Sequence, residues 1–537
     1  MVIESRMSAA KGAFWPIVVL LVVLGLATGC GESRRSEDRL VLVFTSDPSS
    51  LDPAFAKDVY SGTLVNYIFS TLVRFNKDTQ LEGDLSDTFA LGPDRRTYTF
   101  HLRPNARFAS GRPVTPSDVK YSFERLLDPK TASPRSWVLD RLEGAREFMA
   151  GKVSYVSGIR VKGACVTLTL SEPFAPFLGL LSMPAASVVD PDAVRRWGKE
   201  FPRHDSGSGP FTVLSWVRDS GIDLAPNPTH HGGVPKIKGI VVRVLKEPVT
   251  IVTEFKRGNV DIAEVPSSEF TSLTSEPKWA GCVQDMPGLN IYYLGLNCEK
   301  GPFKDLRLRR AAAMAIDRDR IISTVRKGQV VAAMGPIPPG LLGYESGFPG
   351  IRYDPEQAKA LVREAGGAPT SVIRLVQGED KANLEVTQMV QAYLQAVGFR
   401  VKVQPYEGAI FKKRVDEGDF GLFFYSWYAD YPDAENFLFP LFHSSRKGGA
   451  GNGPRYSDPA IDALLTQAQG TTDDKARREL YRQIEDKVVA DASRVFLFNK
   501  KTVYIRQPWV KGFQVYRMFN GDRLLDVFMD QGQLGVW

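Results

Sequence analysis

The sequence predicts an α/β fold, because segments typical of strands alternate with segments typical of helices over the first and last thirds of the chain. Short apolar runs such as Leu40–Thr45 and Gly239–Leu245 are typical of buried strands, whereas apolar side chains between Val386 and Val397 recur at helical spacing. With 537 residues the chain is too long for a single hydrophobic core, so we expect about two to four domains.

The composition is that of an ordinary globular protein, with 43% hydrophobic and 24% charged residues. The formal net charge is +7, and the basic residues are spread along the chain. A solvated surface explains such a distribution better than contact with nucleic acid does, so no nucleic-acid partner is expected.

The amino terminus is typical of a secretory signal. Arg6 and Lys11 precede an apolar run over Phe14–Ala27, which ends in small residues before Cys30. A transmembrane helix needs about 20 apolar residues, so this run is too short to span a membrane and cleavage is expected.

The segment LATGC at the end of this run resembles the lipobox of bacterial lipoproteins. The resemblance implies a signal peptide over residues 1–29, a lipid on Cys30 and a lipid-linked tether over residues 30–38. Under a second interpretation the signal is an ordinary one and Cys30 is incidental.

Three further cysteines, Cys165, Cys282 and Cys298, follow in the chain. Cys282 and Cys298 are the pair closest in sequence, although spacing alone does not establish a disulfide.

Two helices in the chain have clear start signals. Thr115 with Pro116 is expected to cap one helix, and Asp354 with Pro355 is expected to cap another that ends at Gly366. Farther on, the short strand at Val401–Val403 is expected to pair with the strand that follows it.

That following strand, Phe420–Tyr428, is apolar at nearly every position, as is typical of a strand buried on both faces of a sheet. The chain becomes polar directly after it, and Asp430 is the first acid. Because ligands of open α/β sheets usually bind at the carboxyl ends of strands, we expect Asp430 to pair with a ligand amine beside a wall of Trp427 and Tyr428. Alternatively, Asp430 is a solvated or capping acid and Trp427 a core residue.

Sequence motifs of catalysis are missing. The five histidines are scattered, and the chain contains no HExxH, no GxSxG and no four-ligand zinc spacing. We therefore expect no metal site, no cofactor and no enzymatic activity.

Six segments, taken in order, resemble one family: the extracytoplasmic solute-binding proteins of peptide, opine and nickel ABC importers. The segments are SDPSSLDPAFA at 46–56, the stretch 81–129 that contains GRPVTPSDVKYSFERLLDP, GSGPFTVLSW at 207–216, the stretch 294–322 that contains GPFKDLRLRRAAAMAIDRDRII, YDPEQAKALVREAGG at 353–367 and RYSDPAIDALLTQA at 455–468.

This resemblance implies a type II-like periplasmic-binding-protein fold, in which two lobes flank a cleft and an extra subdomain is inserted in the first lobe. It places the first lobe in residues 39–60, 186–286 and 490–537, the inserted subdomain in residues 61–185, and the second lobe in residues 287–489.

The resemblance also implies the site. In peptide-binding members an extended peptide lies between the lobes and pairs with exposed strand edges, and an acid at the end of a central strand binds the peptide α-amino group. That role falls to Asp430. The residues implied to contact the peptide backbone are Trp427, Tyr428, Ser46, Asp47 and Ser49.

The implied function is the capture of di- to oligopeptides by a monomeric, lipid-anchored protein outside the cytoplasm. Such a protein delivers its ligand to a membrane permease, whose ATPase subunits hydrolyse ATP. Alternatives within the family are binding of a nickel chelate, an opine or an oligosaccharide. An alternative outside it is a periplasmic hydrolase, which would turn peptide over instead of retaining it intact.

Overall fold

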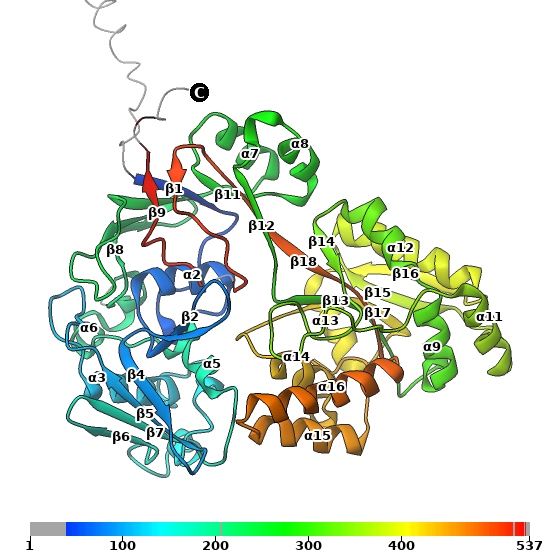
Figure 1. Ribbon diagram of the computed structural model, residues 1–537, viewed down its shortest axis with the longest axis horizontal. Helices are drawn as coiled ribbons and strands as arrows, with labels where there is room; N and C mark the ends of the chain where they lie inside the picture. Colours follow the sequence, from blue (N-terminus) through cyan, green and yellow to red (C-terminus); the bar gives the residue numbers. More distant parts are fainter. Residues whose placement is uncertain (1–38, 205–206, 450, 519–520, 531, 533–537) are drawn as a thin grey trace, which may run out of the picture.

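The computed structural model describes residues 39–204, 207–449, 451–518, 521–530 and 532. The predicted signal peptide, the tether and Cys30 lie outside the described residues. Strands and helices alternate along the described chain, so the predicted α/β class is confirmed (Figure 1). In the described part, the largest sheet has twelve strands, and its main path runs β16-β15-β17-β13-β18-β11-β1-β10-β9-β8.

One end of this path forms the body that we call the first lobe. Here β1 pairs in parallel with β10 and β11 because its alternating buried residues, Leu40, Leu42 and Phe44, pack in one apolar core. The elements of the first lobe are β1 (Arg39–Phe44), α2 (Val59–Ile68), β8 (Phe211–Val217), β9 (Gly221–Pro226), β10 (Gly239–Val244), α7 (Pro248–Lys256), β11 (Ile262–Glu264), α8 (Phe270–Thr274) and β12 (Val283–Pro287).

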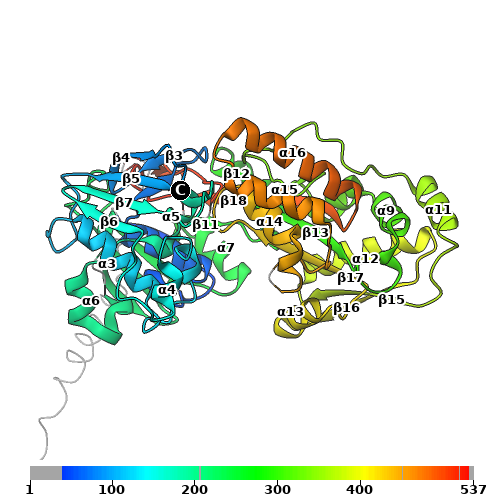
Figure 2. The same ribbon diagram turned by 90° about the horizontal axis from the view of Figure 1, so that it is seen from below.

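The other end of the path forms the second lobe, whose sheet is covered by helices. Figure 2 shows α14, α15 and α16 grouped along this lobe, where their apolar side chains share a core with β13 and β17. The elements are β13 (Asn290–Leu296), α9 (Leu306–Met314), α10 (Arg318–Ile321), β14 (Val330–Ala332), α11 (Pro355–Glu364), β15 (Ile373–Gly378), α12 (Lys381–Ala396), β16 (Val401–Tyr406), α13 (Gly408–Glu417), β17 (Leu422–Tyr428), α14 (Glu435–Phe442), α15 (Pro459–Gly470) and α16 (Asp474–Ala490).

A smaller body with its own core packs beside the first lobe. Its four-stranded sheet has the order β4-β5-β7-β6. Its elements are β2 (Val73–Phe75), β3 (Leu81–Gly83), β4 (Ser86–Leu91), β5 (Thr97–Leu102), α3 (Pro116–Leu127), α4 (Ala145–Met149), β6 (Ile159–Lys162), β7 (Cys165–Thr169) and α5 (Phe177–Leu181). The next helix, α6 (Pro191–Trp197), packs Val194 and Trp197 against the first-lobe core. Helix α2 packs in the first-lobe core, although the predicted boundaries place residues 61–68 in the inserted subdomain. The domain boundaries stay a prediction.

Two chain crossings connect the lobes. One is the long strand β18 (Arg494–Arg506), which pairs with β13 in the second lobe and with β11 and β12 in the first (Figure 1). The other runs from β12 into β13 beside it. The Asn290 side chain joins the two crossings, because it donates to the Lys500 carbonyl at 2.9 Å and accepts from the Lys500 N–H at 2.7 Å. After β18, the short pair β19 (Val510–Lys511) and β20 (Phe528–Met529) completes the first lobe.

The predicted helix starts are confirmed. The Thr115 N–H and hydroxyl both donate to the Asp118 carboxylate at 2.8 Å, which caps α3. Asp354 accepts from the Gln357 N–H at 2.9 Å at the start of α11, and Gly366 follows this helix with a φ of +93°.

Two strand predictions need correction. The predicted pairing of Val401–Val403 with the next strand is wrong, because β16 pairs in parallel with β15, which separates it from β17. The prediction that Phe420–Tyr428 is buried on both faces holds only for the first half of β17. Leu422–Phe424 are buried, whereas Tyr425–Tyr428 become progressively exposed because they leave the covered part of the sheet.

Candidate functional site

A cavity of about 540 Å³ lies where the first lobe faces the end of β17. Its walls come from β1, α2, β11, β18 and residues within 513–518 and 522–524, and Tyr428 contributes from the second lobe. Most of the lining is apolar, with a few polar groups between the apolar side chains. This composition and size are typical of a ligand-binding cavity.

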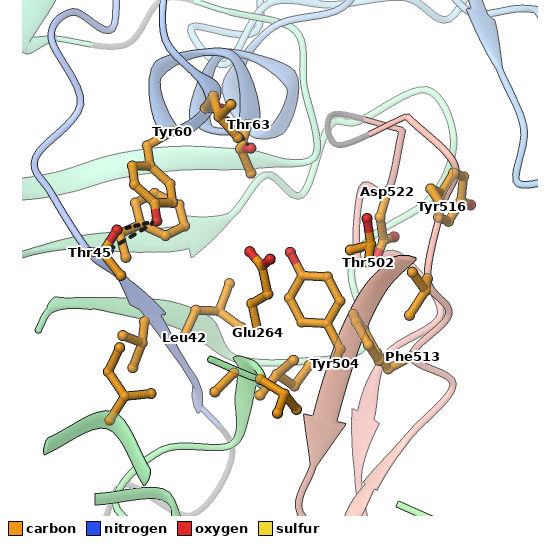
Figure 3. A pocket seen from close by; sticks show the side chains of 18 of the residues that line it. Leu42, Thr45, Tyr60, Thr63, Glu264, Thr502, Tyr504, Phe513, Tyr516 and Asp522 are labelled. Carbon is orange, nitrogen blue, oxygen red and sulfur yellow. Dashed lines mark hydrogen bonds between the residues drawn. The ribbon is translucent and has the colours of Figure 1, made fainter. Parts of the chain in front are cut away.

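The polar groups at the centre of the cavity are carboxylates and tyrosine hydroxyls. Figure 3 shows the Glu264 carboxylate, at the end of β11, beside the Tyr504 hydroxyl of β18, both directed toward Tyr60 and Thr63 of α2. Glu264 has one weak ion pair, with Lys500 at 3.8 Å. Burial raises the pKa of Tyr504 above its ordinary value, so this phenol stays neutral and can donate a hydrogen bond.

A second carboxylate, Asp522, lines the same cavity. Its Oδ1 accepts from the Leu524 N–H at 2.8 Å, whereas its Oδ2 is shielded from solvent and has no hydrogen-bond partner among the described residues. Burial raises the pKa of Asp522 to about 6.

The position of Asp522 is fixed by its neighbour Arg523. The Arg523 guanidinium makes two bonds to the buried Asp84 carboxylate, at 2.6 and 2.9 Å, and a third to the Ser70 hydroxyl at 3.1 Å. His231 contacts the same carboxylate at 3.0 Å. Although burial alone would raise the pKa of Asp84, Arg523 and His231 hold it well below its ordinary value. This buried network anchors the segment that presents Asp522.

The opposite wall is ordered by Tyr60. Its hydroxyl bonds to the Thr45 backbone N–H at 3.1 Å and to the Thr45 hydroxyl at 2.6 Å, as Figure 3 shows. Its ring stacks on Phe44 at a centroid distance of 4.3 Å. The wall formed by β1 and α2 is therefore built before any ligand enters.

Asp430 lies in a separate, smaller hollow of about 20 Å³. Its backbone N–H donates to Asn436 Oδ1 at 2.9 Å, and its carboxylate faces Arg135 at 3.7 Å, beyond hydrogen-bond distance. Burial raises the pKa of Asp430 despite this arginine. Met518 lines both spaces and Gly521 precedes Asp522, so the hollow adjoins the main cavity.

The two aromatic residues before Asp430 occupy different environments. Tyr428 lines the cavity, is 49% exposed and bonds to the Tyr292 hydroxyl at 2.8 Å. Trp427 packs against the second-lobe core, and its indole N–H is buried without a partner among the described residues. Beyond Phe423, in the described chain, β17 pairs with β13 on one side and with no strand on the other. That edge can accept a further strand.

The loop with Ser46, Asp47 and Ser49 lies beside the cavity and does not line it. Asp47 accepts from the Asp219 N–H, which ties the loop to the turn between β8 and β9. The Ser49 hydroxyl donates to Asp58, which caps α2, at 2.5 Å. Ser46 is exposed, and the residue that lines the cavity is the preceding one, Thr45.

Comparison with known proteins identifies the chain. Residues 80–449 match the family described as "Bacterial extracellular solute-binding proteins, family 5 Middle". The chain belongs to this family. A relative of this family 5 protein, the "Probable D,D-dipeptide-binding periplasmic protein DdpA" of Escherichia coli (strain K12), is 32% identical over 510 residues, which cover 92% of this chain and 95% of the relative.

Solved structures agree with this assignment. The "MppA Periplasmic Murein Tripeptide Binding Protein, Unliganded Open Form" matches with a TM-score of 0.79 at 26% identity, over 92% of this chain and 98% of that chain. DppA from Helicobacter pylori in complex with the peptide STSA matches with a TM-score of 0.74 at 28% identity, over 91% and 98% of the two chains. The expected family and the periplasmic-binding-protein fold are confirmed.

Other features of the family 5 protein bear on the expectations from sequence. The thiols of Cys165, Cys282 and Cys298 are free, so Cys282 and Cys298 form no disulfide. Among the residues that the structure describes, no three His, Cys, Asp or Glu side chains gather as metal ligands would. None of the described helices combines the length and the apolar character that crossing a membrane requires.

Sequence patterns did not predict Glu264, Tyr504 or Asp522 as residues of the cavity. A usable signal existed for Glu264, since it is an acid at the end of an apolar strand, as Asp430 is. Tyr504 lies inside the long strand β18, where apolar and polar residues mix without a pattern that distinguishes it. Asp522 lies in an irregular segment, and its position depends on Arg523 reaching Asp84, 439 residues away in sequence.

Proposed function

We propose that this family 5 protein captures peptides outside the cytoplasm and delivers them to the permease of an ABC importer. The observation that carries the proposal is the cavity between the lobes, which combines apolar walls with carboxylates and adjoins an unpaired strand edge. Relatives named for a D,D-dipeptide and a murein tripeptide, and a similar structure in complex with STSA, support a peptide ligand.

In this proposal the peptide backbone adds to the free edge of β17, where Trp427 and Tyr428 supply the pairing groups. Main-chain pairing is independent of side chains, so it gives affinity for many peptides. We also propose that the loop of Ser46, Asp47 and Ser49 contacts the peptide from the first lobe. Support comes from Ser46, which is exposed and directly follows Thr45, a residue that lines the cavity.

Asp430 binds the α-amino group of the peptide. Its only charge partner among the described residues is Arg135, at 3.7 Å, and Arg135 already donates to the carbonyls of Ala56 and Lys57. An ammonium group at hydrogen-bond distance therefore competes well for this carboxylate, because a charge-assisted hydrogen bond is stronger than a distant ion pair.

The two crossings between the lobes supply the hinge that closes the protein on its ligand. The bonds between Asn290 and Lys500 keep the crossings in register while the lobes move.

We further propose that the protein acts as a monomer and that a lipid on Cys30 anchors it. Cys30→Ser should then release the protein from membranes, and unchanged retention in the membrane fraction would contradict the anchor.

Mass spectrometry of ligand released by denaturing the purified protein tests the function. Peptides should be recovered in near-stoichiometric amounts, and protein that is unfolded, dialysed and refolded should serve as the empty control. Recovery of only sugar, opine, haem or metal would contradict peptide capture.

Incubation of the empty protein with peptide distinguishes a binding protein from a hydrolase. After incubation with a binding protein the peptide is recovered intact, whereas a hydrolase leaves fragments.

A further inference from the structure

The charged side chains of the main cavity do not balance. Three charged side chains line it among the described residues: Glu264, Asp522 and Lys500. Lys500 lies 3.8 Å from Glu264 and forms no ion pair with Asp522 in the described chain. Arg74 acts on Asp522 through space, but its guanidinium pairs with Glu82 at 2.6 Å. The cavity therefore carries an excess of negative charge, centred on Asp522.

Asp522 also has an unused acceptor. Its Oδ2 is buried without a hydrogen-bond partner among the described residues. A buried acceptor without a donor is costly, so native structures usually satisfy such atoms through protein, water or ligand. The Arg523–Asp84 ion pair holds the adjacent residue, so Asp522 can bring Oδ2 into the cavity by rotating its own side chain, without breaking that buried network.

The surroundings of Asp522 suit a long side chain with a charged end. Phe513, Val515 and Leu524 contribute apolar surface to the same cavity. Figure 3 shows the Tyr504 ring between Phe513 and the Glu264 carboxylate. An alkyl chain packs against such walls while its terminal cation reaches a carboxylate. A short polar side chain would leave the apolar walls uncovered.

We propose that Asp522, assisted by Glu264, forms a subsite for a basic side chain of the bound peptide. The subsite is distinct from the hollow of Asp430, although Met518 lines both spaces. The preferred ligands are then short peptides that contain lysine or arginine. This inference rests on the proposed function, since it assigns a ligand class to the same cavity.

Calorimetric titration with matched tripeptides tests the subsite. Three peptides carry lysine at the first, second or third position among alanines, and three carry norleucine at the same positions. Norleucine has the apolar stem of lysine without the ammonium. At one or more positions, lysine should bind ~10-fold more tightly than norleucine, because a hydrogen bond to a charged group contributes more than a neutral contact.

The variants locate the effect. Asp522→Asn should reduce the lysine-to-norleucine ratio toward one, and Glu264→Gln should reduce it by a smaller factor. Asp474→Asn is the matched control, because it removes the same charge from a side chain that is 74% exposed and outside the cavity. It should leave the ratio unchanged, and thermal melts of all three variants verify that they fold.

Each outcome decides a separate point. Equal, measurable binding of lysine and norleucine peptides would overturn the basic subsite and leave peptide capture standing. Failure of all six peptides to bind would overturn the subsite together with the proposed function. A lysine preference that survives in Asp522→Asn would assign the selectivity to another residue and contradict the role of Asp522.

Discussion

Asp430 and Asp522 are carboxylates on neighbouring parts of the space between the lobes, but they are held there in different ways. Asp430 follows a regular strand, is partly exposed, and has a distant arginine as its partner. Asp522 lies in an irregular segment near the carboxyl terminus, has no cation of its own within the described chain, and depends on a buried ion pair next to it. The strand that precedes Asp430 is enough to position its side chain. Asp522 lies in an irregular segment, so its position depends on a long-range contact, the ion pair between Arg523 and Asp84.

The largest effect is expected at that anchor. Arg523→Met leaves Asp84, which is 3% exposed, without its cation, and loss of one partner of a buried pair costs ~3–5 kcal/mol of unfolding free energy. Urea denaturation measures this. Lys236→Met, which removes a cation from an exposed pair with Asp526, is the control and should change stability little. A loss in Arg523→Met no larger than that of the control would show that the anchor is not needed.

A smaller effect is expected at Asp430. Asp430→Asn should weaken binding of a free-amine tripeptide by ~10-fold or more, since hydrogen bonds to charged groups contribute about 1.5–3 kcal/mol. The N-acetylated form of the same peptide should bind the variant and the unmodified protein almost equally. If both peptides lose affinity alike, Asp430 is a structural residue that pairs with Arg135.

The pH dependence of binding should distinguish the two acids further. Burial raises the pKa of Asp522 to about 6, so the group is protonated below that pH. A basic side chain requires the ionised form, and affinity for the lysine peptide should therefore fall by ~10-fold between pH 7 and pH 5, relative to the norleucine peptide. The comparison of peptides removes the titration of Asp430, because both carry an α-amine.

The titratable groups around Asp522 do not reverse the expected loss of lysine-peptide affinity at low pH. Those that act on it are Arg74, Asp526 and the Tyr67, Tyr504 and Tyr516 phenols, and the phenols stay neutral over this range because burial raises their pKa values. In Asp522→Asn the difference between the peptides should become independent of pH. A profile that persists in this variant would assign the titration to another group.

The smallest effect is expected at the predicted loop. Ser49→Ala removes the hydrogen bond from Ser49 to Asp58 at the start of α2, which should lower the unfolding free energy by about 1 kcal/mol. Because Ser49 is proposed to contact the peptide, peptide affinity should also fall, by a smaller factor than in Asp430→Asn. Unchanged affinity would contradict that contact and limit Ser49 to supporting α2.

Local patterns made much of the fold predictable. The caps at Thr115 and Asp354 involve residues within four positions of each other in sequence. The starts of these two helices could therefore be predicted from the sequence. The position of β16 was not predictable in the same way, since its partner β15 lies on the far side of a helix in sequence. The order of strands in a sheet depends on how the connecting helices pack on it. The pattern of apolar residues along one strand does not predict which strand lies next to it.

The same division applies to the site. Tyr428 ends an apolar strand and Asp430 follows two residues later, and both line spaces between the lobes. The half-exposed second part of β17 was missed because aromatic residues suit both a core and a binding wall. Asp522 required knowledge of the contact between Arg523 and Asp84, which no local pattern contains.

A crystal structure of the protein with the best-binding lysine tripeptide tests the central claim most directly. The peptide should lie between the lobes along the free edge of β17, with its α-amine within hydrogen-bond distance of Asp430 and its lysine Nζ within hydrogen-bond distance of the Asp522 carboxylate. A peptide whose amine and lysine side chain contact neither carboxylate would contradict the account.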